Sequence, residues 1–149
     1  MDNVTIREAH SEDAEAIAGL SGELGYPSSA AQTVERLNAL LDKKENGVFV
    51  AASPDGRAVG WIHVFITHRV ESGPFAELGG FVVTAECRGR GIGKNLMAEA
   101  ERWVAQRGIS KMRIRSRSTR LDARAFYEGL GYRVGKTQHV FEKSLHKKS

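Results

Sequence analysis

The chain has 149 residues, 41% of them hydrophobic, and 22 Lys and Arg against 18 Asp and Glu give a formal net charge of +4, which favours one globular domain over residues 1–149. The chain has only 3 Pro, and its 16 Gly follow no fixed period, so a collagenous or low-complexity chain is excluded. The single Cys87 excludes an intrachain disulfide and a CxxC zinc site, and no apolar run approaches the roughly 18 residues of a membrane span. The first residues lack the pattern of a signal peptide, so we expect a cytoplasmic protein with no metal and no membrane partner.

The chain begins with a predicted strand and a predicted helix. Residues 4–7 alternate in polarity as a short strand does. Ser11 is the expected N-cap of the helix, with Glu12 and Asp13 in the first turn, where the helix dipole favours anions. We expect this helix to end near residues 22–25.

A second helix is predicted after a short loop. Ser28 or Ser29 is its expected N-cap, and it should end at Lys43, Lys44 and Gly47. Its buried stripe has helical spacing and consists of Val34, Leu37, Leu40 and Leu41.

Two strands, at residues 48–52 and 59–67, are predicted to form a hairpin across the turn Pro54-Asp55-Gly56. Residues 75–84 then form a longer, almost continuously apolar strand. The adjacent glycines 79–80 inside this strand indicate a β-bulge or a close approach of another group to the backbone.

The last part of the chain continues the alternation of helices and strands. A helix follows the glycine-rich turn at residues 88–93 and should end at Gly108. A strand at residues 111–116, a short helix at 122–130 and further strand material at 132–144 complete the order. The expected buried face of the longer helix consists of Leu96, Ala100, Trp103 and Val104.

The predicted order of elements is therefore β α α β β β α β α β. The strand–helix–strand unit at residues 75–116 requires a parallel crossover, whereas the hairpin is antiparallel. We expect an α+β fold with a mixed, mostly antiparallel central sheet and flanking helices.

The glycine-rich segment Arg88-Gly89-Arg90-Gly91-Ile92-Gly93-Lys94 lies between a buried strand and an amphipathic helix. Backbone N–H groups at a helix start face the positive end of the dipole, and glycines let an anion approach closely. With the added charge of three basic side chains, the segment predicts a phosphate or pyrophosphate site. The alternative is an ordinary glycine turn with solubilising arginines.

The spacing of this segment excludes two well-known phosphate motifs. A Walker A loop fails because Arg88 stands where its first glycine belongs and Asn95 follows Lys94. The dinucleotide fingerprint GxGxxG fails because Lys94 stands three residues after Gly91.

Two segments resemble motifs of the GNAT superfamily of acyl-CoA-dependent N-acyltransferases. Residues 81–83 with the glycine-rich segment resemble its motif A, with Arg88, Gly91 and Gly93 in the three fixed places. Residues 123–132 resemble its motif B, AxxFYxxxGY, which includes Tyr127. The predicted order of elements also agrees with this family over essentially the whole chain.

The resemblance implies an N-acetyltransferase that moves the acetyl group of acetyl-CoA directly to a primary amine of a small molecule or peptide. It implies that the backbone of the glycine-rich segment binds the pyrophosphate and that residues 81–83 pair with the pantetheine arm. Arg120 stands seven residues before Tyr127, where many members have Asn, and its contact with the cofactor differs accordingly. The cofactor-binding residues implied are Phe81, Val82, Val83, Arg88, Gly89, Arg90, Gly91, Ile92, Gly93, Lys94 and Arg120.

Acyl transfer from a thioester needs a neutral amine and a proton for the leaving thiolate. The family motif places the hydroxyl of Tyr127 near the sulfur, and a phenol, with an ordinary pKa of about 10, is protonated at neutral pH and can donate that proton. The alternative for Tyr127 is a packed aromatic beside Phe126.

Glu77 is the candidate general base, because a carboxylate in an apolar strand is expected to be functional or paired. The alternative is an ion pair with an arginine. Period-two alternation places Glu77 on the face of Gly79, Phe81 and Val83. Glu71 and His63 are weaker candidates for the base.

We expect the acceptor amine to bind opposite the cofactor, near Tyr26, Trp61 and Glu77. A homodimer is compatible with the sequence.

The other function classes are a non-catalytic CoA-sensing or protein-interaction module and a nucleic-acid binder. The last would use the alternating cations Lys111, Arg113, Arg115 and Arg117. These cations can instead face solvent, form ion pairs or bind an anionic ligand such as the 3′-phosphate of CoA. Without interleaved aromatic residues we expect no nucleic-acid binding.

Overall fold

The computed structural model describes residues 3–23, 25, 28–116 and 121–146. Contacts divide the chain into two compact units, Met1–Arg115 and Ser116–Ser149, and each is described by itself. No described helix is long and apolar enough to cross a membrane.

A five-stranded mixed sheet forms the centre of the first unit. Its strands follow the chain order β1-β2-β3-β4-β5, antiparallel except for the parallel pair β4 and β5. Their bounds are β1 Thr5–Glu8, β2 Asn46–Ala52, β3 Ala58–Arg69, β4 Ser72–Val83 and β5 Met112–Arg113. The predicted fold class, hairpin and parallel crossover are confirmed, although β5 is shorter than expected.

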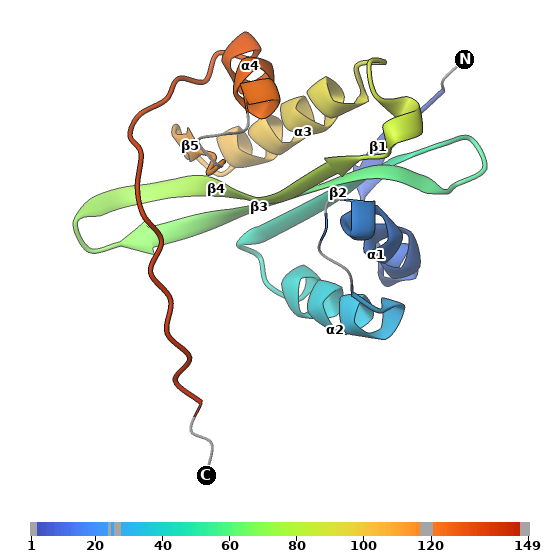
Figure 1. Cartoon of the computed structure of the whole chain (residues 1–149), viewed down its shortest axis with the longest axis horizontal. Helices are drawn as coiled ribbons and strands as arrows, with labels where there is room; N and C mark the ends of the chain where they lie inside the picture. Colours follow the sequence, from blue (N-terminus) through green and yellow to red (C-terminus); the bar gives the residue numbers. More distant parts are fainter. Residues whose placement is uncertain (1–2, 24, 26–27, 117–120, 147–149) are drawn as a thin grey trace. The chain divides into compact units, whose positions relative to one another are not determined.

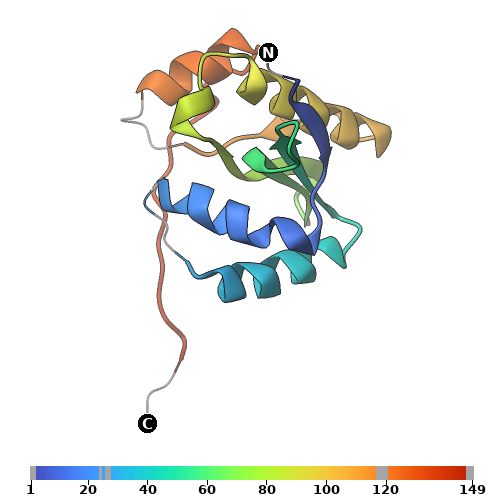
Figure 2. The same cartoon turned by 90° about the vertical axis from the view of Figure 1, so that its right-hand side faces the viewer.

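Helices cover both faces of this sheet. Helices α1 (Ala14–Glu23) and α2 (Ala30–Leu41) lie on one face, and α3 (Ile92–Gln106) lies on the other (Figure 1, Figure 2). The buried side chains beneath α1 and α2 include Ile17, Leu37, Val48 and Val50, with Trp61 packed against them. All four residues predicted for the buried face of α3 are buried.

The start of the first helix differs from the prediction. A 3₁₀ turn at Ser11–Asp13 precedes α1, and His10 rather than Ser11 takes the N-cap position. The reason is Asp13, whose carboxylate accepts hydrogen bonds from the His10 backbone N–H and from the Arg7 guanidinium. Burial opposes ionisation of Asp13, but these bonds outweigh it and lower its pKa below the ordinary value.

The second helix is capped as predicted but buries less than predicted. Ser29 Oγ accepts a hydrogen bond from the Gln32 backbone N–H. Leu37 is buried, whereas Val34 and Leu41 are exposed, so this part of the predicted stripe is wrong. Thr33 is buried instead, because the face that meets the sheet is rotated toward it.

The paired glycines of β4 produce the predicted bulge. The register pairs His63 with Gly80 and Val64 with Leu78, so Gly79 is an additional residue on β4. A Cβ on Gly79 would overlap the ring of His63, and one on Gly80 would overlap the ring of Trp61. Both glycines therefore allow a ring from β3 to approach the backbone of β4.

This bulge changes the face on which Glu77 lies. Glu77 pairs with Phe65 and Val82 pairs with Trp61, and Phe65 and Trp61 share one face of β3. Glu77 therefore shares a face with Gly80 and Val82, the face that α1 and α2 cover further along the sheet. The prediction that it shares a face with Gly79 agrees with this register, because a Cβ on Gly79 would point at the ring of His63 on that face. The prediction is wrong for Phe81 and Val83, because the inserted residue shifts the alternation by one after Gly79.

Both later helices end in a glycine with positive φ. After α3, the N–H groups of Gly108 and Ile109 donate to the carbonyls of Ala105 and Val104, the pattern of a Schellman motif. In the second unit α4 spans Leu121–Gly129 and ends at Gly131 in the same way.

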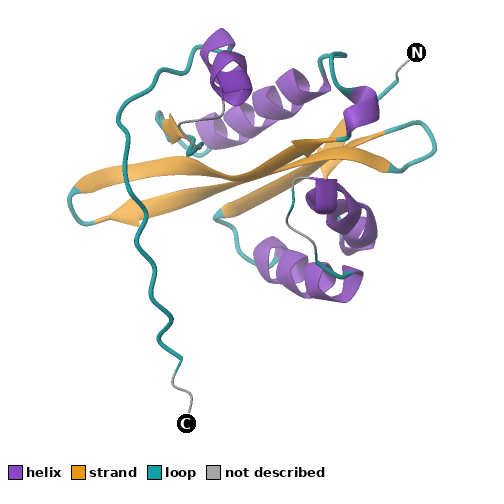
Figure 3. Ribbon diagram, viewed as in Figure 1, coloured by secondary structure: helices purple, strands orange, loops and turns teal. Residues whose placement is uncertain are grey.

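The predicted strand at residues 132–144 is absent from the described structure, where the chain after α4 is a loop (Figure 3). A strand requires a neighbour for its backbone hydrogen bonds, and the described residues of the second unit contain no other strand. The apolar side chains in this segment are consequently exposed, namely Val134, Val140, Phe141 and Leu145.

Candidate active site

The glycine-rich turn has the backbone geometry that the sequence predicts for an anion site. Gly89 and Gly91 have φ values of 82° and 81°, in the left-handed region that glycine adopts without strain. A Cβ at either position would meet no other atom within 4 Å, so backbone conformation rather than crowding requires glycine here. The space beside the turn is therefore open to a ligand.

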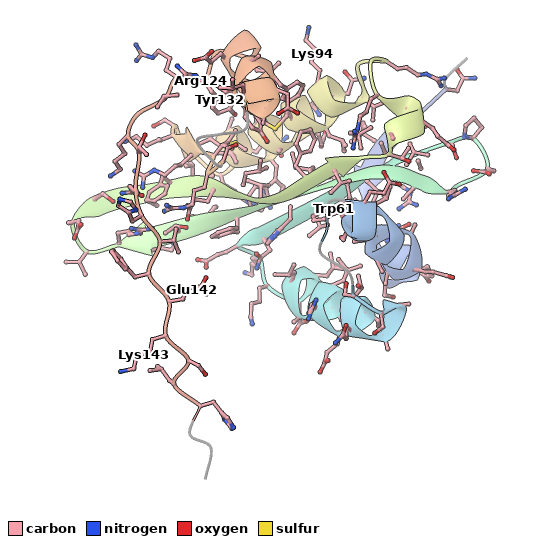
Figure 4. All side chains as sticks on the ribbon, in the orientation of Figure 1. Trp61, Lys94, Arg124, Tyr132, Glu142 and Lys143 are labelled. Atoms are coloured by element: carbon pink, nitrogen blue, oxygen red, sulfur yellow. The ribbon has the colours of Figure 1, made fainter. Side chains whose placement is uncertain are left out.

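The start of α3 supplies hydrogen-bond donors beside this turn. Gly91 is the N-cap, and the N–H of Asn95 donates to the Gly91 carbonyl as the first bond of the helix. The N–H groups of Ile92, Gly93 and Lys94 precede that bond and have no acceptor within the helix. Lys94 extends from α3 away from the sheet and adds positive charge (Figure 4). These groups fit the pyrophosphate of a CoA ester.

The strand that leads into the turn is fixed at its end. The Nε of Arg88 donates to the carbonyl of Val83, at 3.2 Å, so this side chain braces the turn against β4. Glu23, at the end of α1, accepts hydrogen bonds from the Thr84 hydroxyl and the Ala85 N–H. The α1 end and the glycine-rich turn are thus tied to the same point of the sheet.

The β4–β5 ladder is short. It joins only Ala76 with Met112 and Glu77 with Arg113. Residues 81–83 of β4, which the sequence predicts to pair with pantetheine, lie beyond the paired segment and immediately before the turn. These residues and the glycine-rich turn are therefore close neighbours along the chain.

Glu77 is buried, with 7% of its surface exposed, and both carboxylate oxygens have partners. Its Oε2 lies 2.7 Å from Nε of Arg115, and its Oε1 accepts a hydrogen bond of 3.2 Å from the Thr67 hydroxyl. The ion pair that the sequence left as the alternative for Glu77 is therefore present. It does not exclude a role in the reaction, because a carboxylate oxygen can accept more than one hydrogen bond.

Aromatic side chains of β3 lie on the same face as Glu77. Trp61 packs on the α1 and α2 side of the sheet, and its indole N–H is buried without a hydrogen-bond partner among the described residues (Figure 4). His63 lies between Trp61 and Phe65, with Nε2 2.9 Å from Oδ1 of Asn46. Burial lowers the pKa of His63 from 6.5 to about 4, so its ring is neutral at pH 7.

The other predicted site residues are not all placed. Tyr127 lies in α4 of the second unit, with its ring packed edge-on against Phe126 and Tyr132. Tyr26 and Arg120 lie outside the described residues.

Sequence reasoning missed several side chains that the fold brings to the site. Thr67 and Asn46 carry no motif, and Glu23 lies 61 residues from its partner Thr84. Arg115 belongs to the alternating cations noted in the sequence, but the sequence does not show which carboxylate it pairs with. The contacts of Thr67, Asn46 and Arg115 depend on strand register, and that of Glu23 depends on where α1 packs on the sheet. Single-residue patterns give neither.

Two further features bear on the site. A hollow of about 750 Å³ opens where α3 ends and β2 begins, lined by residues such as Lys43, Glu45, Trp103 and Arg107, and it is separate from the glycine-rich turn at the start of α3. Among the described residues, no group of three or more His, Cys, Asp or Glu side chains is placed to hold a metal ion.

Comparison with known proteins agrees with this geometry. The sequence profile of the Acetyltransferase (GNAT) family matches residues 7–132. The aminoglycoside N(6′)-acetyltransferase type 1 of Stenotrophomonas maltophilia is 33% identical over 132 residues, which cover 86% of this chain and 85% of that protein.

Solved structures share the fold. The aminoglycoside 6′-N-acetyltransferase AAC(6′)-Ih from Acinetobacter baumannii has a TM-score of 0.84 at 18% identity, with 97% of this chain and 100% of that chain covered. A transcriptional regulator from Bacillus halodurans has a TM-score of 0.85 at 24% identity, with 95% and 100% covered. The chain therefore belongs to the GNAT acetyltransferase family and is an N-acetyltransferase that transfers the acetyl group of acetyl-CoA to an amine.

Proposed function

We propose that the acceptor is an aminoglycoside and that the acetylated group is its 6′-amine. The observation that carries this proposal is the 33% identity, over 86% of the chain, with a protein named as an aminoglycoside N(6′)-acetyltransferase. The carboxylate of Glu77 lies on an aromatic-lined face and can accept a further hydrogen bond from an ammonium group of a polycationic sugar, beside its bonds to Arg115 and Thr67.

Acetyl-CoA supplies the activated acetyl group as a thioester. In this proposal the glycine-rich turn and the first turn of α3 hold the pyrophosphate, and residues 81–83 of β4 line the pantetheine arm. Arg120 contributes a further contact. The left-handed glycines and the N–H donors at the start of α3 support this assignment.

Two side chains carry the proton transfers in this proposal. Glu77 receives the ammonium of the acceptor and takes its proton, directly or through a water. Tyr127 donates a proton to the departing sulfur. Trp61 and Tyr26 line the acceptor side, and the aromatic surface of Trp61 packs near Gly80 on the face that carries Glu77.

A pair of natural aminoglycosides tests the acceptor. Neomycin and paromomycin differ only at the 6′ position, which carries an amine in neomycin and a hydroxyl in paromomycin. We expect CoA release with neomycin and at least tenfold slower release with paromomycin, followed with a thiol reagent, and mass spectrometry of the neomycin product should show one added acetyl group. Equal rates would move acetylation to another amine, and release with neither sugar would remove aminoglycosides as acceptors.

The other function classes are less well supported. Two cations of the basic segment contact side chains of β4, because Arg115 pairs with Glu77 and Arg113 stacks on Phe75, which weakens the case for a nucleic-acid surface. A non-catalytic CoA-binding module would retain the glycine-rich turn but would not release thiol with any amine. The proposal also includes a cytoplasmic location, where acetyl-CoA is made and used. It further includes a homodimer.

A further inference from the structure

The carboxylate of Glu77 is held from two sides. Arg115 Nε lies 2.7 Å from one oxygen, and the Thr67 hydroxyl lies 3.2 Å from the other. The Glu77 side chain is only 9% exposed, whereas Arg115 is 49% exposed. The anion is therefore fixed inside the protein, and its cationic partner reaches it from the surface.

Strand register brings these three residues together. Glu77 lies opposite Phe65 on β3, and Thr67 is the next residue of β3 on the same face. Glu77 also lies opposite Arg113 on β5, and Arg115 is two residues further along the chain. Each partner thus comes from a neighbouring strand or its direct extension, a placement more rigid than that of a mobile loop.

The two contacts have a defined effect on the carboxylate. An unpaired buried charge is costly, and the guanidinium of Arg115 offsets that cost. One bond to each oxygen also fixes the rotation of the carboxylate group. Each oxygen keeps a lone pair for a further donor, such as the ammonium of an acceptor.

We propose that Arg115 and Thr67 are positioning residues for Glu77, whose carboxylate they keep oriented toward the acceptor amine. This inference rests on the proposed roles of Glu77 and of a cationic acceptor. Arg115 acts here only through Glu77, and neither Arg115 nor Thr67 exchanges a proton with the substrate.

The test is steady-state kinetics of Arg115→Met with neomycin as acceptor. We expect kcat/KM for neomycin to fall by roughly 10- to 100-fold, because small misplacements of a reacting group have effects of that size. The KM for acetyl-CoA should stay within about twofold of wild type. Arg115→Lys, which keeps the charge, should recover part of the loss, and Thr67→Ser should retain activity that Thr67→Val loses.

Arg69→Met is the matched control. Arg69 is another exposed guanidinium near the same end of the sheet, where it stacks on Phe75 at 5.3 Å. Its removal should leave both kinetic constants near wild type. Circular dichroism and thermal melting of every variant separate loss of folding from loss of positioning.

A double-mutant comparison decides whether Arg115 acts through Glu77. In the Glu77→Gln background, Arg115→Met should change kcat/KM by less than about threefold, because no anion remains to be positioned. Full additivity would overturn the inference, and so would a folded Arg115→Met enzyme with wild-type kinetics. A raised KM for acetyl-CoA instead of for neomycin would also overturn it, by assigning Arg115 to a phosphate of the cofactor. A wild-type enzyme inactive on neomycin would contradict the proposed acceptor itself.

Discussion

The His63 side chain shows how one buried group links the fold to pH. Burial lowers its pKa from 6.5 to about 4, and Nε2 faces Oδ1 of Asn46. At a pH between these two pKa values, the unfolded chain binds a proton at His63 and the folded chain does not. The free energy of unfolding therefore falls as the pH is lowered from about 7 to about 4.

The first prediction follows from this shift. Replacing His63 by Gln should remove up to about 3 kcal/mol of the decrease in unfolding free energy between pH 7 and pH 4, since one pKa unit corresponds to about 1.4 kcal/mol. Urea denaturation at several pH values measures it. The exposed His139→Gln variant is the control and should keep the wild-type slope. An identical slope in His63→Gln would show that His63 is protonated in the folded protein.

The second prediction concerns the Tyr127 hydroxyl. Tyr127→Phe keeps the ring that packs against Phe126 and Tyr132, so stability should change little. If the hydroxyl protonates the leaving thiolate, kcat should fall by roughly 10²- to 10⁴-fold while the KM for acetyl-CoA stays near wild type. Single-turnover kinetics measure the chemical step directly.

The control for Tyr127 is Tyr132→Phe, which removes a hydroxyl from the neighbouring ring and should lower kcat much less. A wild-type chemical step in Tyr127→Phe would remove Tyr127 from the mechanism. Solvent would then be the source of the proton.

At the scale of elements, the glycine-rich turn and α3 act together. The turn needs positive φ at Gly89 and Gly91, and α3 begins where the second of these glycines ends the turn. Arg88 and Glu23 fix the turn to the end of β4 from two sides. The donors at the start of α3 are therefore oriented before any ligand binds, which lowers the entropic cost of binding.

The third prediction tests this element. Gly91→Val should lower the free energy of unfolding by about 1–2 kcal/mol, because a side chain is strained at a φ of 81°. The β-branch of the valine should also block the approach of pyrophosphate. We expect CoA affinity to fall at least tenfold by calorimetry. Gly56→Val is the matched control, with a φ of 90° in the β2–β3 turn and open space around it.

Gly56→Val should lose similar stability but keep its affinity for CoA. Equal affinities in the Gly91→Val variant, the control and the wild type would contradict the assignment of the pyrophosphate to this turn. Equal losses of CoA affinity in both variants would show that backbone strain, rather than a blocked pyrophosphate site, causes the effect.

The sequence predicts those elements whose causes are local. The hairpin turn, the start of α3 at Gly91 and its end at Gly108 follow from backbone preferences of a few adjacent residues. The capping bond from the His10 backbone N–H to Asp13 is also local, but the prediction placed the N-cap at Ser11. The ion pair of Asp13 with Arg7 joins this turn to the preceding strand, and it depends on tertiary structure.

The site was predicted less completely, because it depends on pairing between distant residues. The bulge at Gly79 was expected, but its consequence for the face of Glu77 needed the register with β3. The partner Arg115 lies 38 residues from Glu77 and is selected by the parallel pairing of β4 and β5. The strand expected at residues 132–144 has the composition of a strand, but backbone pairing cannot be deduced from composition.

At the scale of the whole molecule, the proposed mechanism requires one sheet to bind a large anion and a cationic acceptor. The turn before α3 offers N–H donors and basic side chains, whereas the face that carries Glu77 offers a paired carboxylate and aromatic rings. The net charge of +4 favours approach of the anionic cofactor. Local groups rather than net charge must therefore attract a cationic acceptor.

The last prediction is that acetyl-CoA stabilises the folded chain. A ligand that binds only the folded state adds about 2.7 kcal/mol at 100 times its dissociation constant. For a domain near 150 residues this corresponds to a rise in Tm of roughly 5–10 °C, measured by scanning calorimetry. Pantetheine, which lacks the pyrophosphate, should give a much smaller shift at the same concentration, and Gly91→Val should lose most of the shift that Gly56→Val retains. Equal shifts with pantetheine and acetyl-CoA would mean that the glycine-rich turn contributes nothing to binding, and the cofactor would then have to be held by β4 alone.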